Sequence, residues 1–165
     1  GGKVAASGRP LPALLQWLLA HPYLRVRPPR STGRELYNEQ FLTEVLRRAR
    51  GAAHEDIIHT AALFTPLSVY DAYCRFVQKK SVVDELIVSG GGAKNGFFMD
   101  ALNGLFCDAR VSTADAAGMS ADAKEAICFA ILAHETILGV PANLPRVTGA
   151  QRPVVLGVVA RPRGR

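Results

Sequence analysis

A run of glycines directly after a short apolar stretch is the feature that most constrains the fold of this chain. Residues 86–88 are apolar, residues 90–92 are all glycine, and a helical pattern follows over residues 95–106. An apolar run without alternation is typical of a buried strand, and a strand that turns directly into a helix begins a parallel crossover. With a second strand expected at Arg110–Thr113, the sequence predicts an α/β fold whose partly parallel sheet is covered by helices.

The remainder of the chain is expected to be mainly helical. Apolar residues recur at helical spacing in a stretch that starts at Pro12, over residues 35–50 and over about 55–78, where Pro66 is expected to kink or break the helix. A further helix is expected to begin at a Ser120 cap and to run to about residue 138, before Gly139. Residues 1–9 are expected to be the end of a strand and a turn. The sequence therefore predicts a helix-rich chain with few strands.

Composition and charge exclude several classes of protein. The chain has 165 residues, of which 48% are hydrophobic and 21% charged, as in one globular domain. The longest apolar run is too short for a membrane helix and no secretory leader opens the chain, so we expect a soluble, cytoplasmic protein without a membrane partner.

Residues 1–50 carry nine basic and three acidic side chains. Their arginines are scattered without a nucleic-acid-reading module, so we expect a solvated or anion-contacting surface and no nucleic-acid partner.

Cysteine and histidine spacing gives no metal or hydrolase pattern. The three cysteines are odd in number and widely spaced, and they are expected to be buried free thiols: Cys74, Cys107 and Cys128. His54 and His59 diverge on a helix, and His134 is expected to be a core or boundary residue. No Gly-x-Ser-x-Gly elbow is present. We predict no metal site and no catalytic triad.

The strongest candidate site is the glycine turn, which we define as Gly90, Gly91 and Gly92, with Asn95 after it. Glycines let a backbone approach a flat or anionic ligand, and the following helix directs amide groups toward it. The dinucleotide fingerprint fails because Asn95 stands where glycine is required, and the Walker pattern fails because Phe97 follows Gly96. From the residues alone, a plain tight turn and a nucleotide contact both remain open.

Glu125 is the second candidate. It precedes eight consecutive apolar residues at the start of the last long helix. A carboxylate there is favoured by the helix dipole, which is the simpler interpretation. The functional alternative is a carboxylate at a pocket floor that accepts hydrogen bonds from ligand hydroxyls.

Four blocks in order resemble the anhydro-N-acetylmuramic acid kinases of the actin-like sugar-kinase superfamily. They are His21-Pro22-Tyr23 with residues 27–35 (RPPRSTGRE), residues 89–95 (SGGGAKN), residues 122–126 (DAKEA), and residues 143–150 (NLPRVTGA) with 154–157 (VVLG). The resemblance extends over nearly the whole chain. It implies a ribonuclease H-like, actin-like ATPase fold, with residues 1–165 as a single C-terminal domain whose N-terminal strands are incomplete and whose N-terminal partner domain is absent.

The resemblance also implies an activity. In such kinases water opens the 1,6-anhydro ring of anhydro-N-acetylmuramate, and O6 takes the γ-phosphoryl group of ATP with Mg²⁺, giving N-acetylmuramate 6-phosphate in peptidoglycan recycling. By this resemblance the glycine turn and Asn95 border the adenine and ribose, and Glu125 faces the sugar. A homodimer is one expected assembly.

The departures from the family pattern are equally informative. The Gly-Thr-Ser-x-Asp-Gly phosphate loop and the Asp-Thr-Gly-Pro-Gly-Asn segment with the catalytic aspartate do not occur, and Ala142 replaces a usual glycine. We therefore assign no catalytic residue to this chain, and expect it to be inactive alone and either marginally stable or self-associating. Two alternatives are a catalytically dead nucleotide-binding or interaction remnant, and another sugar kinase of the superfamily.

Overall fold

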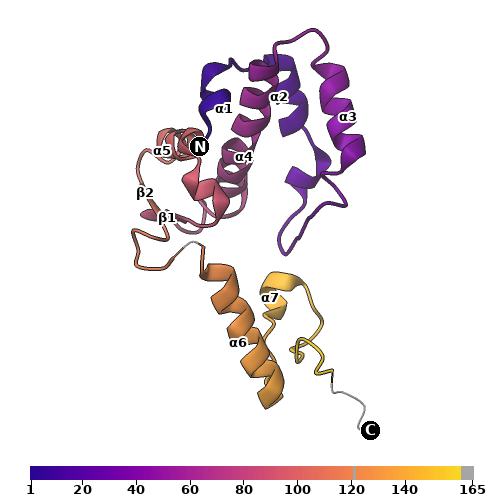
Figure 1. Ribbon diagram of the computed structural model, residues 1–165, viewed down its shortest axis with the longest axis vertical. Coiled ribbons are helices and arrows are strands. Elements are labelled where there is room, and N and C mark those ends of the chain that lie inside the picture. Colours follow the sequence, from indigo (N-terminus) through magenta and orange to yellow (C-terminus); the bar gives the residue numbers. More distant parts are fainter. Residues whose placement is uncertain (121, 161–165) are drawn as a thin grey trace. The chain divides into compact units, whose positions relative to one another are not determined.

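The computed structural model describes residues 1–120 and 122–160, which form two compact units (Figure 1). The first comprises residues 1–27 and 32–121, and the second comprises residues 28–31 and 122–165. Helices dominate both units and the two strands lie in the first. The predicted helix-rich α/β class is confirmed at this level.

Five α-helices belong to the first unit: α1 (Lys3–Ser7), α2 (Pro12–Leu19), α3 (Glu39–Arg48), α4 (His54–Phe76) and α5 (Gly96–Leu105). Helix α2 starts at Pro12, whose fixed φ suits a first helical position. Pro66 lies inside α4, which continues through it although proline removes one backbone donor. The strand and turn expected over residues 1–9 are wrong, because this segment forms α1, which packs against α4 and α5.

The core of the first unit gathers apolar side chains of α2 and of the carboxyl end of α3, with Ile57 and Phe64 of α4 packed against them. Its buried members are Leu14, Leu18, Val45 and Ala49. The rings of Trp17 and Phe41 stack at its edge with centroids 5.6 Å apart. These positions follow the helical repeat, so each helix turns one apolar face inward.

The two strands, β1 (Glu85–Val88) and β2 (Arg110–Thr113), pair in parallel. Glu85 lies opposite Arg110 and Val88 opposite Thr113, and α5 forms the connection between the strands. This is the predicted strand–turn–helix–strand order. The expectation of a fully buried first strand is wrong, because Ile87 is 51% exposed and the burial alternates along β1.

The second unit is built around α6 (Lys124–Leu138), with the short α7 (Pro145–Thr148) after it. Helix α6 ends at Gly139, whose φ of +70° is the left-handed conformation that glycine supplies at helix ends. The predicted cap position at Ser120 is wrong, because the structure places the cap position of α6 at Ala123, whose side chain makes no capping hydrogen bond.

Two further expectations need correction. Cys107 and Cys128 are exposed and Cys74 is partly buried, so the predicted set of buried thiols is wrong. His134 is exposed on α6 beside the carboxylate of Glu135, so it is no core residue. Within residues 1–120 and 122–160, no helix is both long and apolar enough to cross a membrane.

Candidate functional site

The glycine turn directly follows β1 and contains the short 3-10 helix Gly91–Lys94. Gly90 has a φ of +80° and a ψ of −168°, a backbone conformation in which a side chain is strained. A Cβ added at Gly90 or Gly91 would meet no other atom within 4 Å in the described part of the chain. The turn therefore presents open backbone surface that a ligand can approach closely.

The turn lies at the carboxyl edge of the parallel strand pair. The amide of Ala114, directly after β2, donates to the carbonyl of Val88 at 2.9 Å, so both strands end at the same level. Open parallel sheets bind ligands outside the carboxyl ends of their strands. The position predicted from sequence thus coincides with the edge where ligand sites occur in α/β proteins.

The amino end of α5 differs from what the sequence predicts. The Asn95 side chain accepts a hydrogen bond from the amide of Phe98 at 3.3 Å, and the Gly1 carbonyl accepts one from the amide of Gly96 at 3.2 Å. Two of the amides expected to be free for a ligand are therefore bonded within the protein. This favours contact of a ligand with the flat surface of the turn over capture of an anion by the helix end.

Glu125 belongs to the second unit, where it occupies the first turn of α6 and is exposed. A carboxylate at this position is stabilised by the helix dipole. Gly90, Gly91, Gly92 and Asn95 are brought together in one turn of the first unit. The candidate residues are thus divided between the two units.

The distribution of potential metal ligands gives no cluster. In the part of the chain that the structure describes, no three His, Cys, Asp or Glu side chains are arranged to hold a metal ion. The Nδ1–H of His59 donates to the Ala5 carbonyl at 2.7 Å, and its ring packs edge-on against Phe97 at 4.9 Å, which is a structural role. The described residues therefore supply no complete ligand set for Mg²⁺ by themselves.

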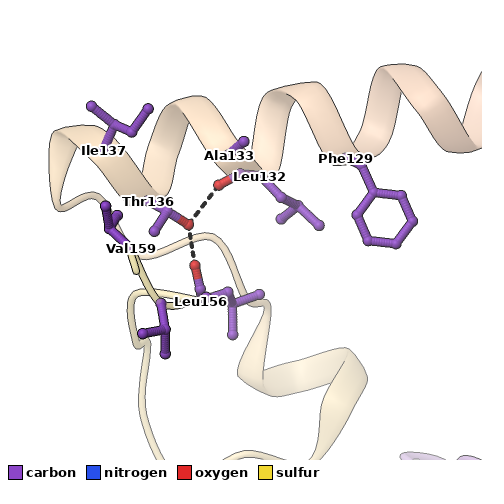
Figure 2. A pocket seen from close by; sticks show the side chains of 9 residues that line it. Phe129, Leu132, Ala133, Thr136, Ile137, Leu156 and Val159 are labelled. Atoms are coloured by element: carbon purple, nitrogen blue, oxygen red, sulfur yellow. Dashed lines mark hydrogen bonds between the residues drawn. The ribbon is translucent and has the colours of Figure 1, made fainter. Parts of the chain in front are cut away.

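An apolar hollow of about 460 Å³ in the second unit was not predicted (Figure 2). Residues 156–159 form one wall and α6 forms the other, with Phe129 and Leu132 among its lining residues. The hydroxyl of Thr136 donates to the carbonyls of Leu132 and Leu156, which attaches the segment to the helix. The sequence signal that could have indicated this hollow is the run of eight apolar residues in α6. None of the described lining residues is charged, so they offer packing surface.

The geometry thus defines an α/β protein with a glycine turn at the carboxyl edge of a parallel strand pair. Comparison with known proteins then shows the family: the model for anhydro-N-acetylmuramic acid kinase matches residues 1–162. The chain belongs to the anhydro-N-acetylmuramic acid kinase family, as the resemblance predicted.

Individual relatives agree with this assignment. The chain is 42% identical over 159 residues to an anhydro-N-acetylmuramic acid kinase of Francisella tularensis subsp. novicida, covering 96% of this chain and 42% of that protein. It is 39% identical over 163 residues to the kinase of the same name from Bacillus thuringiensis subsp. konkukian, covering 98% and 43%. The Salinibacter ruber protein of that name is 42% identical over 163 residues, covering 98% and 41%. The chain spans about two fifths of the length of these curated relatives.

Proposed function

We propose that this chain supplies the C-terminal part of an ATP-dependent kinase that converts anhydro-N-acetylmuramate to N-acetylmuramate 6-phosphate in peptidoglycan recycling, in the cytoplasm. Family membership over residues 1–162 is the observation that carries the proposal. The reaction adds water across the 1,6-anhydro bond at the anomeric carbon, and the freed O6 takes the γ-phosphoryl group of ATP, which leaves ADP. We further propose that residues 1–165 form one C-terminal domain of an actin-like fold, and that the complete kinase is a homodimer.

In this proposal the glycine turn and Asn95 border the adenine and ribose of ATP. The open surface at Gly90 and Gly91 and the position at the carboxyl edge of the strands support this role. The internal bonding of the Gly96 and Phe98 amides supports a neutral ligand surface here. The triphosphate is therefore expected to be held mainly by other groups of the complete kinase.

Glu125 is proposed to face the sugar and to accept hydrogen bonds from its hydroxyl groups. Its exposed carboxylate in the first turn of α6 is accessible to a ligand. Removal of a proton from the attacking water requires a positioned base, and we assign that role to no residue of this chain. When bound to ATP, Mg²⁺ offsets the charge of the triphosphate, and we assign no residue among those described to hold it.

The proposal is tested by joining this chain to the part of a curated relative that it does not span. The preceding part of the Francisella kinase, fused in register before Gly1, should give a chain that forms phosphorylated sugar from ATP and anhydro-N-acetylmuramate, followed by ³¹P NMR. We expect Gly91→Val in this fusion to raise the KM for ATP, and Glu125→Gln to raise the KM for the sugar. A folded fusion that binds neither ATP nor the sugar would contradict the proposal and favour a remnant without kinase function.

A further inference from the structure

The start of the chain packs directly on the amino end of α5, beside the glycine turn. Gly2 caps α1 with a φ of +84°. A Cβ at Gly2 would lie 2.1 Å from Oδ1 of Asn95 and 2.9 Å from Cβ of Phe97, distances at which atoms cannot coexist. The space that Gly2 leaves empty is therefore the space that the Asn95 side chain occupies.

Asn95 connects this contact to the glycine turn. The side-chain oxygen of Asn95 accepts a hydrogen bond from the backbone amide of Phe98 at 3.3 Å. The backbone amide of Asn95 donates a hydrogen bond to the Gly92 carbonyl at 3.0 Å. Displacement of the side chain would remove the cap of α5 and disturb the backbone of the turn at its last glycine. Gly1 adds a second connection through the 3.2 Å bond from the Gly96 amide to its carbonyl.

Helix α1 is held firmly enough that it cannot easily move away from this contact. At its far end a Cβ on Gly8 would lie 2.1 Å from the Glu55 carbonyl oxygen, so α1 and α4 meet backbone to backbone there. Ala5 is buried and its carbonyl accepts from His59 at 2.7 Å. The amide of Arg9 donates to the Asp56 carboxylate at 2.7 Å. A side chain at Gly2 must therefore displace the Asn95 side chain and the start of α5 at Phe97, not α1.

We propose that Gly2 is a positioning residue for the nucleotide-binding turn. By lacking a side chain it lets Asn95 cap α5 and hold the carboxyl end of the glycine turn in the conformation that ATP contacts. The inference rests on the proposed function, because it assigns the glycine turn to the nucleotide. It goes beyond that function by giving a residue far from the turn in sequence control over its shape.

The test uses the fusion with the preceding part of the Francisella kinase and measures its ATP binding in the presence of Mg²⁺, with the amide signals of Gly92 and Phe98 followed by NMR. Gly2→Ala should raise the Kd for ATP about fivefold, the change that corresponds to one lost capping interaction. The Phe98 and Gly92 amide signals should shift in the absence of ATP. Gly51→Ala is the matched control, because Gly51 has a φ of +85° and an added Cβ there meets no described atom within 4 Å. It should leave the Kd and both signals unchanged.

A second variant separates positioning from a general loss of stability. Serine caps a helix about as well as asparagine with a shorter side chain, so Gly2→Ala should cost less ATP affinity in an Asn95→Ser background than in the parent. Equal costs in both backgrounds would overturn the inference, as would an unchanged Kd in Gly2→Ala. Absence of ATP binding by the folded parent fusion would overturn the proposed site and this inference with it. The preceding outcomes would overturn the inference alone.

Discussion

Thr60 provides the sharpest test of how the first unit is held together. Its side chain is fully buried, at 0% exposure, on α4. The hydroxyl donates to the Asp56 carbonyl at 2.7 Å and accepts from the Leu11 amide at 2.9 Å. The second bond attaches the start of α2 to α4, so Thr60 joins two elements that are distant in sequence.

Thr60→Val keeps the shape of the side chain and removes only the hydroxyl. The Leu11 amide then loses its partner, and leaving a buried donor unpaired costs about 1–3 kcal/mol. We expect the free energy of unfolding to fall by about 2 kcal/mol, which corresponds to a decrease in Tm of about 4–8 °C for a chain of this size. Urea unfolding followed by circular dichroism measures the change.

Thr60→Ser is the matched control, because it keeps the hydroxyl and removes one methyl group. Loss of a buried methyl costs about 1 kcal/mol, so serine should be the milder substitution. If valine destabilises the chain less than serine does, the hydroxyl does not hold α2 to α4 and the reasoning fails.

Three further predictions follow from individual contacts. Asn95→Ala should lower the free energy of unfolding by about 1 kcal/mol through loss of the α5 cap, and Asn95→Ser should restore most of it; equal denaturation midpoints for both variants would contradict the capping role. The hydrogen bond from Arg47 lowers the pKa of Glu44 to about 2 from 4.5, so its contribution to stability is present above pH 4.5 and lost as the pH falls through about 2. Glu44→Gln should remove that contribution, and an NMR titration midpoint for Glu44 near 4.5 would refute it. Phe129 and Ile137 on α6 are 71% and 75% exposed, so we expect the chain to self-associate through them. In analytical ultracentrifugation the double variant Phe129→Ser, Ile137→Ser should sediment closer to a monomer than the parent does. A parent that is monomeric at high concentration would contradict this prediction.

Features with strong local signals could be predicted from the sequence. Helix α2 begins at Pro12 and α6 ends before Gly139, because each residue fits that backbone position by its own geometry. Strand β2 has the predicted bounds, Arg110–Thr113. The place of the glycine turn between strand and helix could be predicted for the same reason.

Features that depend on distant contacts could not be predicted. Helix α1 is only five residues long, and packing against α4 and α5 stabilises it where local propensity does not. The Gly1 carbonyl that occupies the Gly96 amide comes from the opposite end of the unit in sequence. No pattern near residue 96 signals this bond. Because this bond occupies the Gly96 amide, we expect the site to offer a ligand a flat backbone surface and not an anion-binding helix end.

The central claim is that the glycine turn contacts ATP. Calorimetry of ATP binding, in the presence of Mg²⁺, to the fusion with the preceding part of the Francisella kinase tests it most directly. Gly91→Val places a branched side chain on the open surface, and Gly104→Val is the control, because an added Cβ at Gly104 also meets no described atom within 4 Å. We predict ATP binding by the parent fusion and by its Gly104→Val variant, and loss of ATP binding in its Gly91→Val variant. Equal ATP affinity in all three chains would contradict it.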